Sequence, residues 1–190
     1  MSFNFKKIYS TPFFDIEEGL DLNYIDTEPY YRLTGLDSVI CFIITMDGKF
    51  VMVRQFRPVI GEFSLEFPAG ELMKGEQPLD AAKRELFEET SLTTDLIYLG
   101  EFRLMMNRTN IKEHIFFGII SNNITQYAFE KGLELELVSR QDLLKLSISG
   151  GYKHLAGLGI IQLASNYLGL NIMNEKMEII SKKFESKLNK

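Results

Sequence analysis

The sequence predicts an α/β fold. Two observations predict it: strand-like segments, either alternating or continuously apolar, fill most of the chain up to residue 138, and helical periodicity appears after Pro78 and again beyond residue 138. At 190 residues, with 45% hydrophobic and 25% charged residues, the chain can bury a full core as one domain with a short arm.

The strands divide the chain into an arm, residues 1–35, and a main domain, residues 36–190. Interleaved polar and apolar residues predict short antiparallel strands in the arm, at 6–9, 13–16 and 20–26. In the domain, the Asp47-Gly48 dipeptide is typical of a tight hairpin and joins the first two strands. The strands expected in the domain are 39–45, 50–56, 63–67, 96–102, 114–120 and 134–138.

Four helices are expected. Pro78 begins the first, because a missing amide is harmless in a first turn, and Asp80 places an acid near its positive end. Ser139 is expected to cap the second. Helical periodicity over 155–168 and an amphipathic pattern over 175–190 predict the other two.

Composition excludes several classes of function. The net charge of −5 and the pI near 5.2 argue against nucleic-acid or anionic-membrane binding, since no basic stripe is present. No apolar run has transmembrane length and no signal peptide opens the chain, so we expect a cytoplasmic protein. The lone Cys41 excludes an intramolecular disulfide and a multi-cysteine zinc site, and its apolar neighbours predict a buried strand thiol.

Three glutamates, Glu85, Glu88 and Glu89, share one face of the first predicted helix. Like charges three or four residues apart on a helix repel by a few tenths of a kcal/mol per pair, unless something neutralises them. Clustered carboxylates suit hard cations, with Mg²⁺ or Mn²⁺ the usual choice where a substrate adds phosphate oxygens. A solvated acidic surface is the alternative interpretation.

The residues around these glutamates match a known pattern. Gly70 and Glu76 precede the stretch Arg84–Glu89, and the apolar Leu92 follows it. This spacing resembles the Nudix box, and only Ser91 departs from it, where the pattern has glycine. Because that glycine caps the helix in a left-handed conformation, which a non-glycine residue adopts at modest cost, we interpret Ser91 as tolerated.

The segments around the box resemble those of the ADP-ribose pyrophosphatases and nucleotide-sugar hydrolases within the Nudix hydrolase superfamily. They are Arg54–Pro58, Leu65–Gly70 and Val138–Leu144. The resemblance implies an α/β/α sandwich with a mixed central sheet, an N-terminal antiparallel β arm and C-terminal helices. It also implies Mg²⁺-dependent hydrolysis of the pyrophosphate bond of a nucleoside diphosphate linked to a sugar, giving a nucleoside monophosphate and a sugar phosphate. Mn²⁺ is the alternative cofactor.

The same resemblance implies a homodimer formed through the N-terminal arm, which carries Tyr24, Tyr30 and Tyr31. Two departures concern the substrate. Proteins that hydrolyse ADP-ribose usually have a proline about fifteen residues after the box, where this chain has 104–109, and an acid where this chain has Ile111. Glu113 is the nearest acid to that place. The choice between ADP-ribose and another nucleotide sugar therefore stays open.

By resemblance, Glu85 and Glu89 are the principal metal ligands, the backbone carbonyl of Ala69 is a further ligand, and Glu88 is a catalytic neighbour. Arg84 has two interpretations: it fixes the box by pairing with an acid such as Glu76, or it contacts phosphate directly.

Arg54, Arg57 and Glu66 are the expected substrate-binding residues. For Arg57 an exposed strand arginine is an equal alternative to a group that holds phosphate or ribose. The resemblance places the general base at Glu130, with Glu134 in reserve, and either is equally a solvated loop acid.

His114 is expected to be structural, and His154 to cap the helix that follows it. A rival interpretation from another class is a Nudix module that binds its ligand without turnover.

Overall fold

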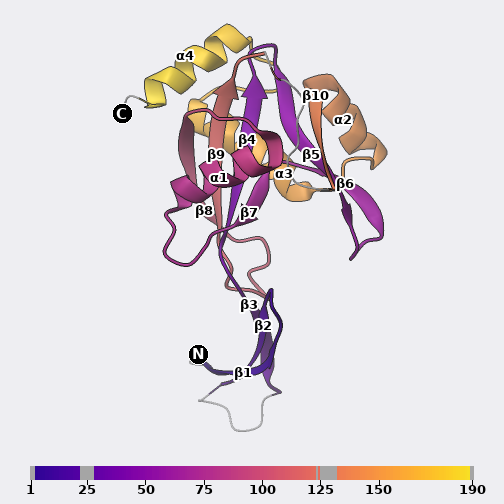
Figure 1. Ribbon diagram of the computed structural model, residues 1–190, viewed down its shortest axis with the longest axis vertical. Coiled ribbons are helices and arrows are strands. Elements are labelled where there is room, and N and C mark those ends of the chain that lie inside the picture. Colours follow the sequence, from indigo (N-terminus) through magenta and orange to yellow (C-terminus); the bar gives the residue numbers. More distant parts are fainter. Residues whose placement is uncertain (1–2, 22–27, 123, 125–131, 189–190) are drawn as a thin grey trace.

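The computed structural model describes residues 3–21, 28–122, 124 and 132–188 of the chain (Figure 1). A seven-stranded sheet forms the centre of the main body, in the order β10-β5-β4-β9-β8, with β6 beside β5 and β7 beside β4. The β4–β9 pair is parallel and the other pairs are antiparallel, so the sheet is mixed. Its strands are β4 (Ser38–Thr45), β5 (Lys49–Arg57), β6 (Glu62–Glu66), β7 (Ala69–Glu71), β8 (Leu96–Phe102), β9 (Glu113–Ile120) and β10 (Leu133–Ser139).

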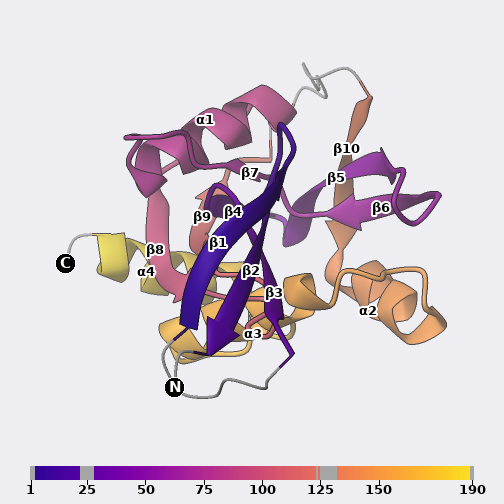
Figure 2. The same ribbon diagram turned by 90° about the horizontal axis from the view of Figure 1, so that it is seen from below.

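Helices cover both faces of this sheet (Figures 1 and 2). Helix α1 (Pro78–Thr90) lies on one face, and α3 (Leu155–Leu168) and α4 (Met177–Leu188) lie on the other. Helix α2 (Arg140–Ser149) follows β10 directly, with the Ser139 side chain accepting a hydrogen bond from the Asp142 amide as its cap. The architecture is therefore the expected α/β/α sandwich.

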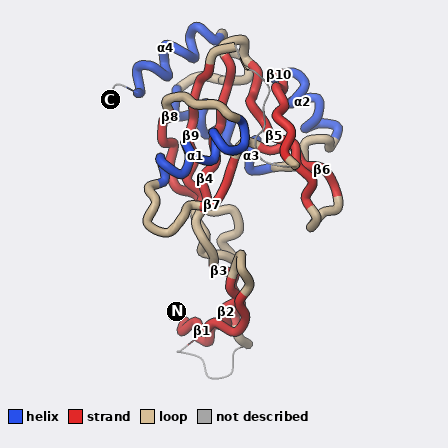
Figure 3. The backbone as a smooth tube through the Cα atoms, viewed as in Figure 1, coloured by secondary structure: helices blue, strands red, loops and turns tan. Residues whose placement is uncertain are grey.

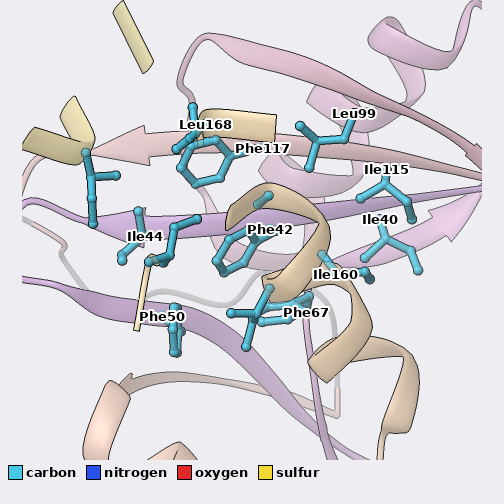
Figure 4. Close-up of a cluster of buried hydrophobic side chains, with 14 of the residues drawn as sticks. Ile40, Phe42, Ile44, Phe50, Phe67, Leu99, Ile115, Phe117, Ile160 and Leu168 are labelled. Carbon is cyan, nitrogen blue, oxygen red and sulfur yellow. The ribbon is translucent and has the colours of Figure 1, made fainter. Parts of the chain in front are cut away.

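Strand β4 shows how the sequence builds the two layers. Successive side chains of a strand point to opposite faces, and β4 is buried on both. Ile40, Phe42 and Ile44 enter the core beneath α3 and α4, which Figure 4 shows. Val39, Cys41 and Ile43 enter the core beneath α1. A strand with apolar residues on both faces thus requires a helical layer on each.

A second, three-stranded antiparallel sheet projects from the main body (Figures 1 and 3). It contains β1 (Phe3–Ser10), β2 (Asp15–Asp21) and β3 (Tyr30–Thr34), with β2 in the middle. The Leu33 amide donates to the Arg108 carbonyl at 2.7 Å, which ties β3 to the loop between β8 and β9.

Two strands were missed by the sequence analysis. Residues 30–34 form β3, whereas a strand was expected at 20–26, a segment that lies partly outside the described residues. The expected strand at 63–67 ends at Glu66, and the chain pairs again at Ala69 with a different neighbour, β4. Pro68 lies between them, and because it has no amide to donate it interrupts the ladder.

Within the described residues, no helix is both long and apolar enough to cross a membrane.

Ser91 ends α1 in the left-handed conformation, with φ 61° and ψ 18°, and its amide donates to the Phe87 carbonyl at 2.8 Å. This is the geometry that the family pattern assigns to glycine, so the expectation that serine tolerates it is confirmed.

We predict that Ser91→Gly raises the free energy of unfolding by about 0.5–1 kcal/mol, because glycine adopts positive φ without steric cost. Ser181→Gly, inside α4, is the matched control and should lower it by a similar amount. Urea titration followed by circular dichroism measures both, and a less stable Ser91→Gly protein contradicts the prediction.

Candidate active site

Helix α1 presents its glutamates at the edge of the sandwich because its other face is buried. Ala81, Ala82 and Leu86 pack into the core against the sheet, which fixes the rotation of the helix. Glu85 and Glu89 are one turn apart, on the side that faces β7. The buried face of α1 therefore places the expected metal ligands against the segment that holds Ala69 and Gly70.

The three carboxylates differ in exposure. Glu89 is 5% exposed, the Glu85 side chain is 13% exposed, and the Glu88 side chain is 51% exposed. Glu89 accepts a hydrogen bond from the Ala69 amide at 3.0 Å. Glu85 packs on Gly70 so closely that a Cβ built there would lie 2.0 Å from its Cδ atom. The structure thus explains the need for glycine at position 70: it makes room for a carboxylate.

Arg84 connects the cluster to the preceding loop. Its guanidinium donates to both carboxylate oxygens of Glu76 at 2.9 and 3.0 Å, to Glu85 at 2.6 Å and to Glu88 at 3.0 Å. It also donates to the Glu71 carbonyl at 3.0 Å. The expected Arg84–Glu76 pair is present. The hydrogen bonds to Glu76 are the main cause of the raised pKa of Arg84, and they lower the pKa of Glu76. Arg84 therefore offsets the repulsion between Glu85 and Glu88.

Cys41 lies under this helix, with its thiol donating to the Ala82 carbonyl at 3.2 Å. Burial raises the pKa of the thiol, and the negative charges of Glu89 and Glu85 raise it further. The thiol is thus held protonated, as the expectation of a buried, unreactive cysteine requires.

Arg57 and Glu66 form a second charged group, on the β5–β6 hairpin. The guanidinium of Arg57 donates to the two carboxylate oxygens of Glu66 at 2.8 and 2.6 Å, a bidentate pair. This pair raises the pKa of Arg57, and the charge of Glu89 adds to the effect. Burial raises the pKa of Glu66, but hydrogen bonds from Arg57 and Ser64 outweigh it and the net change is downward. The charge of Arg57 therefore interacts with that of Glu89 on α1.

Arg54 is not part of this group. It lies three residues from Arg57 along β5, so the two side chains leave opposite faces of the strand. Arg54 stacks on the Phe63 ring, 4.8 Å from its centroid, and lies 3.8 Å from Glu136. The structure separates Arg54 from the pair that sequence similarity grouped with it.

The sequence analysis did not predict the burial of two polar groups whose electrostatics involve Glu66. Within the part of the chain that the structure describes, the Tyr152 hydroxyl and the His154 Nδ1 atom are buried without a hydrogen-bond partner. His154 occupies the N-cap position of α3, as expected, but its side chain accepts no capping hydrogen bond. Burial lowers the pKa of His154, Glu66 opposes this and Arg57 adds to it. In the sequence, Gly157 is the signal that could have indicated the burial of Tyr152, because a Cβ at position 157 would collide with the Tyr152 hydroxyl.

Of the two acids proposed as the general base, the structure describes one. Glu130 lies outside the described residues. Glu134 is exposed on β10, opposite Arg54 of β5 in the ladder.

His114 is buried and hydrogen-bonded to the Tyr98 hydroxyl at 3.0 Å. Glu113, at the start of β9, is half-buried, and burial raises its pKa.

The oxygen donors on α1 are of the chemical type that binds a divalent cation. Three carboxylates share one helix face, Gly70 leaves room for the carboxylate of Glu85, and oxygen donors are those that Mg²⁺ and Mn²⁺ prefer. Among the described residues, however, no three acidic, histidine or cysteine side chains converge on one point. Arg84 instead lies against Glu85 and Glu88.

Comparison with known proteins identifies the family. The model of the NUDIX domain matches residues 36–155, well over half of the chain. The chain belongs to the Nudix family. This match includes α1 and its glutamates, the Arg57–Glu66 pair and Tyr152. Nudix hydrolases generally use divalent metal ions, in agreement with the oxygen donors gathered on α1.

Curated relatives match a shorter segment. An ADP-ribose pyrophosphatase of Bacillus subtilis (strain 168) is 46% identical over 56 residues, 30% of each chain. An ADP-sugar pyrophosphatase of Mus musculus is 58% identical over 40 residues, 21% of this chain and 18% of that protein. The matches thus span less than a third of these relatives' lengths.

A crystal structure of an ADP compounds hydrolase is similar in fold to most of this chain. The TM-score is 0.69 with 18% identity, over 88% of this chain and 94% of that one. At this identity the likeness concerns the fold.

We predict that Gly70→Ala weakens Mn²⁺ binding at least about tenfold, because the new methyl group displaces the Glu85 carboxylate. Isothermal titration calorimetry measures the affinity. Gly159→Ala is the matched control, since a Cβ there meets no atom within 4 Å. Equal Mn²⁺ affinity in the wild type and Gly70→Ala would show that Glu85 is not a ligand.

Proposed function

We propose that this Nudix protein hydrolyses the pyrophosphate bond of a nucleoside diphosphate linked to a sugar, with Mg²⁺ or Mn²⁺ as cofactor. The products are a nucleoside monophosphate and a sugar phosphate. The observation that carries the proposal is the carboxylate face of α1, held against β7 by the Glu89–Ala69 hydrogen bond and the Glu85–Gly70 contact.

The chemistry requires this kind of site. The oxygens of a pyrophosphate are anionic and repel an attacking water, so a catalyst must offset their charge and orient the water. A divalent cation, when bound, would supply that charge and would lower the pKa of the attacking water. Glu85, Glu89 and the Ala69 carbonyl would hold the cation, and the exposed Glu88 lies beside them.

Arg57 is our candidate for the residue that holds the substrate phosphate or ribose. Its guanidinium is oriented by the bidentate pair with Glu66, and the side chain is 46% exposed, so donor groups remain accessible. Glu66 then acts as a positioning residue. We further propose that Arg84 acts through Glu76 to fix the loop before α1, since its hydrogen bonds are directed to that loop and to the helix.

ADP-ribose and ADP-sugars are the first substrates to test. The relatives named for these compounds share the segment around the box, which supports the substrate class but not the choice between the two. The general base can be identified with the same hydrolysis assay, by replacing Glu88 and Glu130 in turn.

We predict that Glu89→Gln lowers the rate of hydrolysis by about 100-fold or more, because the charge is lost while the amide oxygen still accepts the bond from Ala69. The measurement is release of nucleoside monophosphate, by chromatography, from ADP-ribose, ADP-sugars, GDP-sugars, UDP-sugars and dinucleotides with Mg²⁺.

Glu178→Gln, an exposed position on α4, is the matched control and should keep the wild-type rate. A Glu89→Gln preparation with full activity would overturn the proposal. If the wild type binds metal but hydrolyses none of these compounds, the result would instead favour a Nudix module that binds its ligand without turnover.

We also propose a homodimer formed through the arm. The β1–β2–β3 sheet stands apart from the helical layers, and its exposed apolar side chains include Phe13 at 75%, Tyr9 at 61% and Leu20 at 53%. Small isolated sheets are marginally stable, and exposed apolar side chains favour burial against a second surface. A second copy presents the same surface, which suits a two-fold contact.

The dimer predicts a solution mass of twice 21.9 kDa, measurable by light scattering during gel filtration. Tyr9→Asp with Phe13→Asp should shift the protein to the monomer mass, since two charges would be buried at the contact. Ile148→Asp, at an equally exposed apolar residue on α2, should leave the mass unchanged. A monomeric wild type would refute the dimer.

A further inference from the structure

The arm meets the main body at the loop between β8 and β9 (Figure 1). A pocket of about 320 Å³ lies at this junction. Strands β1 and β3 form one wall, with Phe5, Tyr30 and Arg32, and the loop between β8 and β9 forms the other, with Arg103 and Arg108 among its residues. None of the individual residues assigned above to metal or substrate binding lines the pocket, and its loop wall includes residues 106–109, from the segment where ADP-ribose hydrolases usually have a proline.

The lining of this pocket is strongly cationic. Three of its nine residues are arginines and none is acidic, although the chain as a whole carries a net charge of −5. A local excess of positive charge on an acidic protein attracts anions at short range. The positive charge is therefore local to this pocket, whereas the chain as a whole is negatively charged.

Two of the arginines have no ion pair with a carboxylate in the described ranges. Arg32 pairs with Glu17 at 2.7 Å. Arg103 and Arg108 donate to backbone carbonyls, of Asn110 and Asn107, which do not neutralise their charge. Glu101 interacts with Arg103 at longer range, but it is paired with Lys112 at 2.9 Å.

Two of the three arginines also lie over aromatic rings. Arg32 stacks on Phe5, 3.6 Å from the ring centroid, and Arg108 lies 5.8 Å from the centroid of Tyr30. The Tyr30 hydroxyl donates to the Asn107 carbonyl, which fixes that ring to the loop. Each guanidinium has five N–H donors, so these contacts orient the groups and leave donors for a ligand.

We propose that this pocket binds the phosphate group of a small phosphorylated metabolite, separately from the α1 site. Arg103 and Arg108 on the loop and Arg32 on the arm are its ligands. Planar guanidinium groups match phosphate geometry, and the two without a carboxylate partner, Arg103 and Arg108, supply the charge that suits a dianionic group. The bound phosphate links the arm to the main body, because its ligands come from both.

The test is calorimetric titration of the full-length protein with inorganic phosphate, AMP and ribose 5-phosphate, in EDTA so that metal-dependent turnover is absent. At least one probe should bind the wild type. Arg103→Gln with Arg108→Gln should weaken that binding about 100-fold, since two charge-assisted contacts are lost. Equal affinity for all three probes identifies free phosphate as sufficient, and tighter AMP or ribose 5-phosphate identifies a phosphate ester.

Lys182→Gln with Lys183→Gln, both exposed on α4, removes the same charge elsewhere and should change the affinity less than about twofold. Thermal unfolding without ligand verifies that each variant is folded. The proposal is overturned if no probe binds the wild type, if the arginine variant binds as tightly as the wild type, or if Arg57→Ala abolishes the binding instead. The Glu89→Gln assay tests the α1 site independently.

Discussion

The docking of α1 on β4 and β7 is the contact on which the candidate site depends. Ala81, Ala82 and Leu86 exclude water beneath the helix, and that burial fixes which side of α1 faces the strand edge. The Ala69 amide then meets Glu89, and the absence of a side chain at Gly70 lets Glu85 approach. Hydrophobic packing on one face of the helix thus sets the position of the charges on the other.

Such a concentration of carboxylates needs compensation, and Arg84 provides it within the box. It contacts Glu76, Glu85 and Glu88 together, with a side chain only 22% exposed, where Coulomb interactions are less screened than on an open surface. The loop before α1 is therefore anchored by the same charges that form the site. A cation that bound Glu85 would compete with Arg84 for the same carboxylate.

The arm raises a different physical problem. Its three strands bury little by themselves, yet they are tied to the main body through the loop between β8 and β9, by the Leu33–Arg108 and Tyr30–Asn107 hydrogen bonds. The same loop supplies two of the three arginines of the cationic pocket. One junction therefore combines the attachment of the arm with a pocket lined by three arginines.

The sequence by itself determined the layered fold and the carboxylate cluster. The two-sided apolar pattern of 38–45, the Asp47-Gly48 turn and the periodicity of 78–90 are local signals, and local backbone preferences are sufficient to interpret them. The spacing of Glu85, Glu88 and Glu89 likewise places them on one helix face without further information.

Only the tertiary structure decided which distant residues meet. The pairing of Ala69 with β4, the hydrogen bond from the Ala69 amide to Glu89 and the approach of Glu85 to Gly70 all depend on how strands and helices stack. The cationic pocket, assembled from residues more than seventy positions apart, belongs to the same class. The physical reason is that contacts between layers arise from packing the whole core, whereas sequence periodicity reports only the direction in which each side chain leaves its own element.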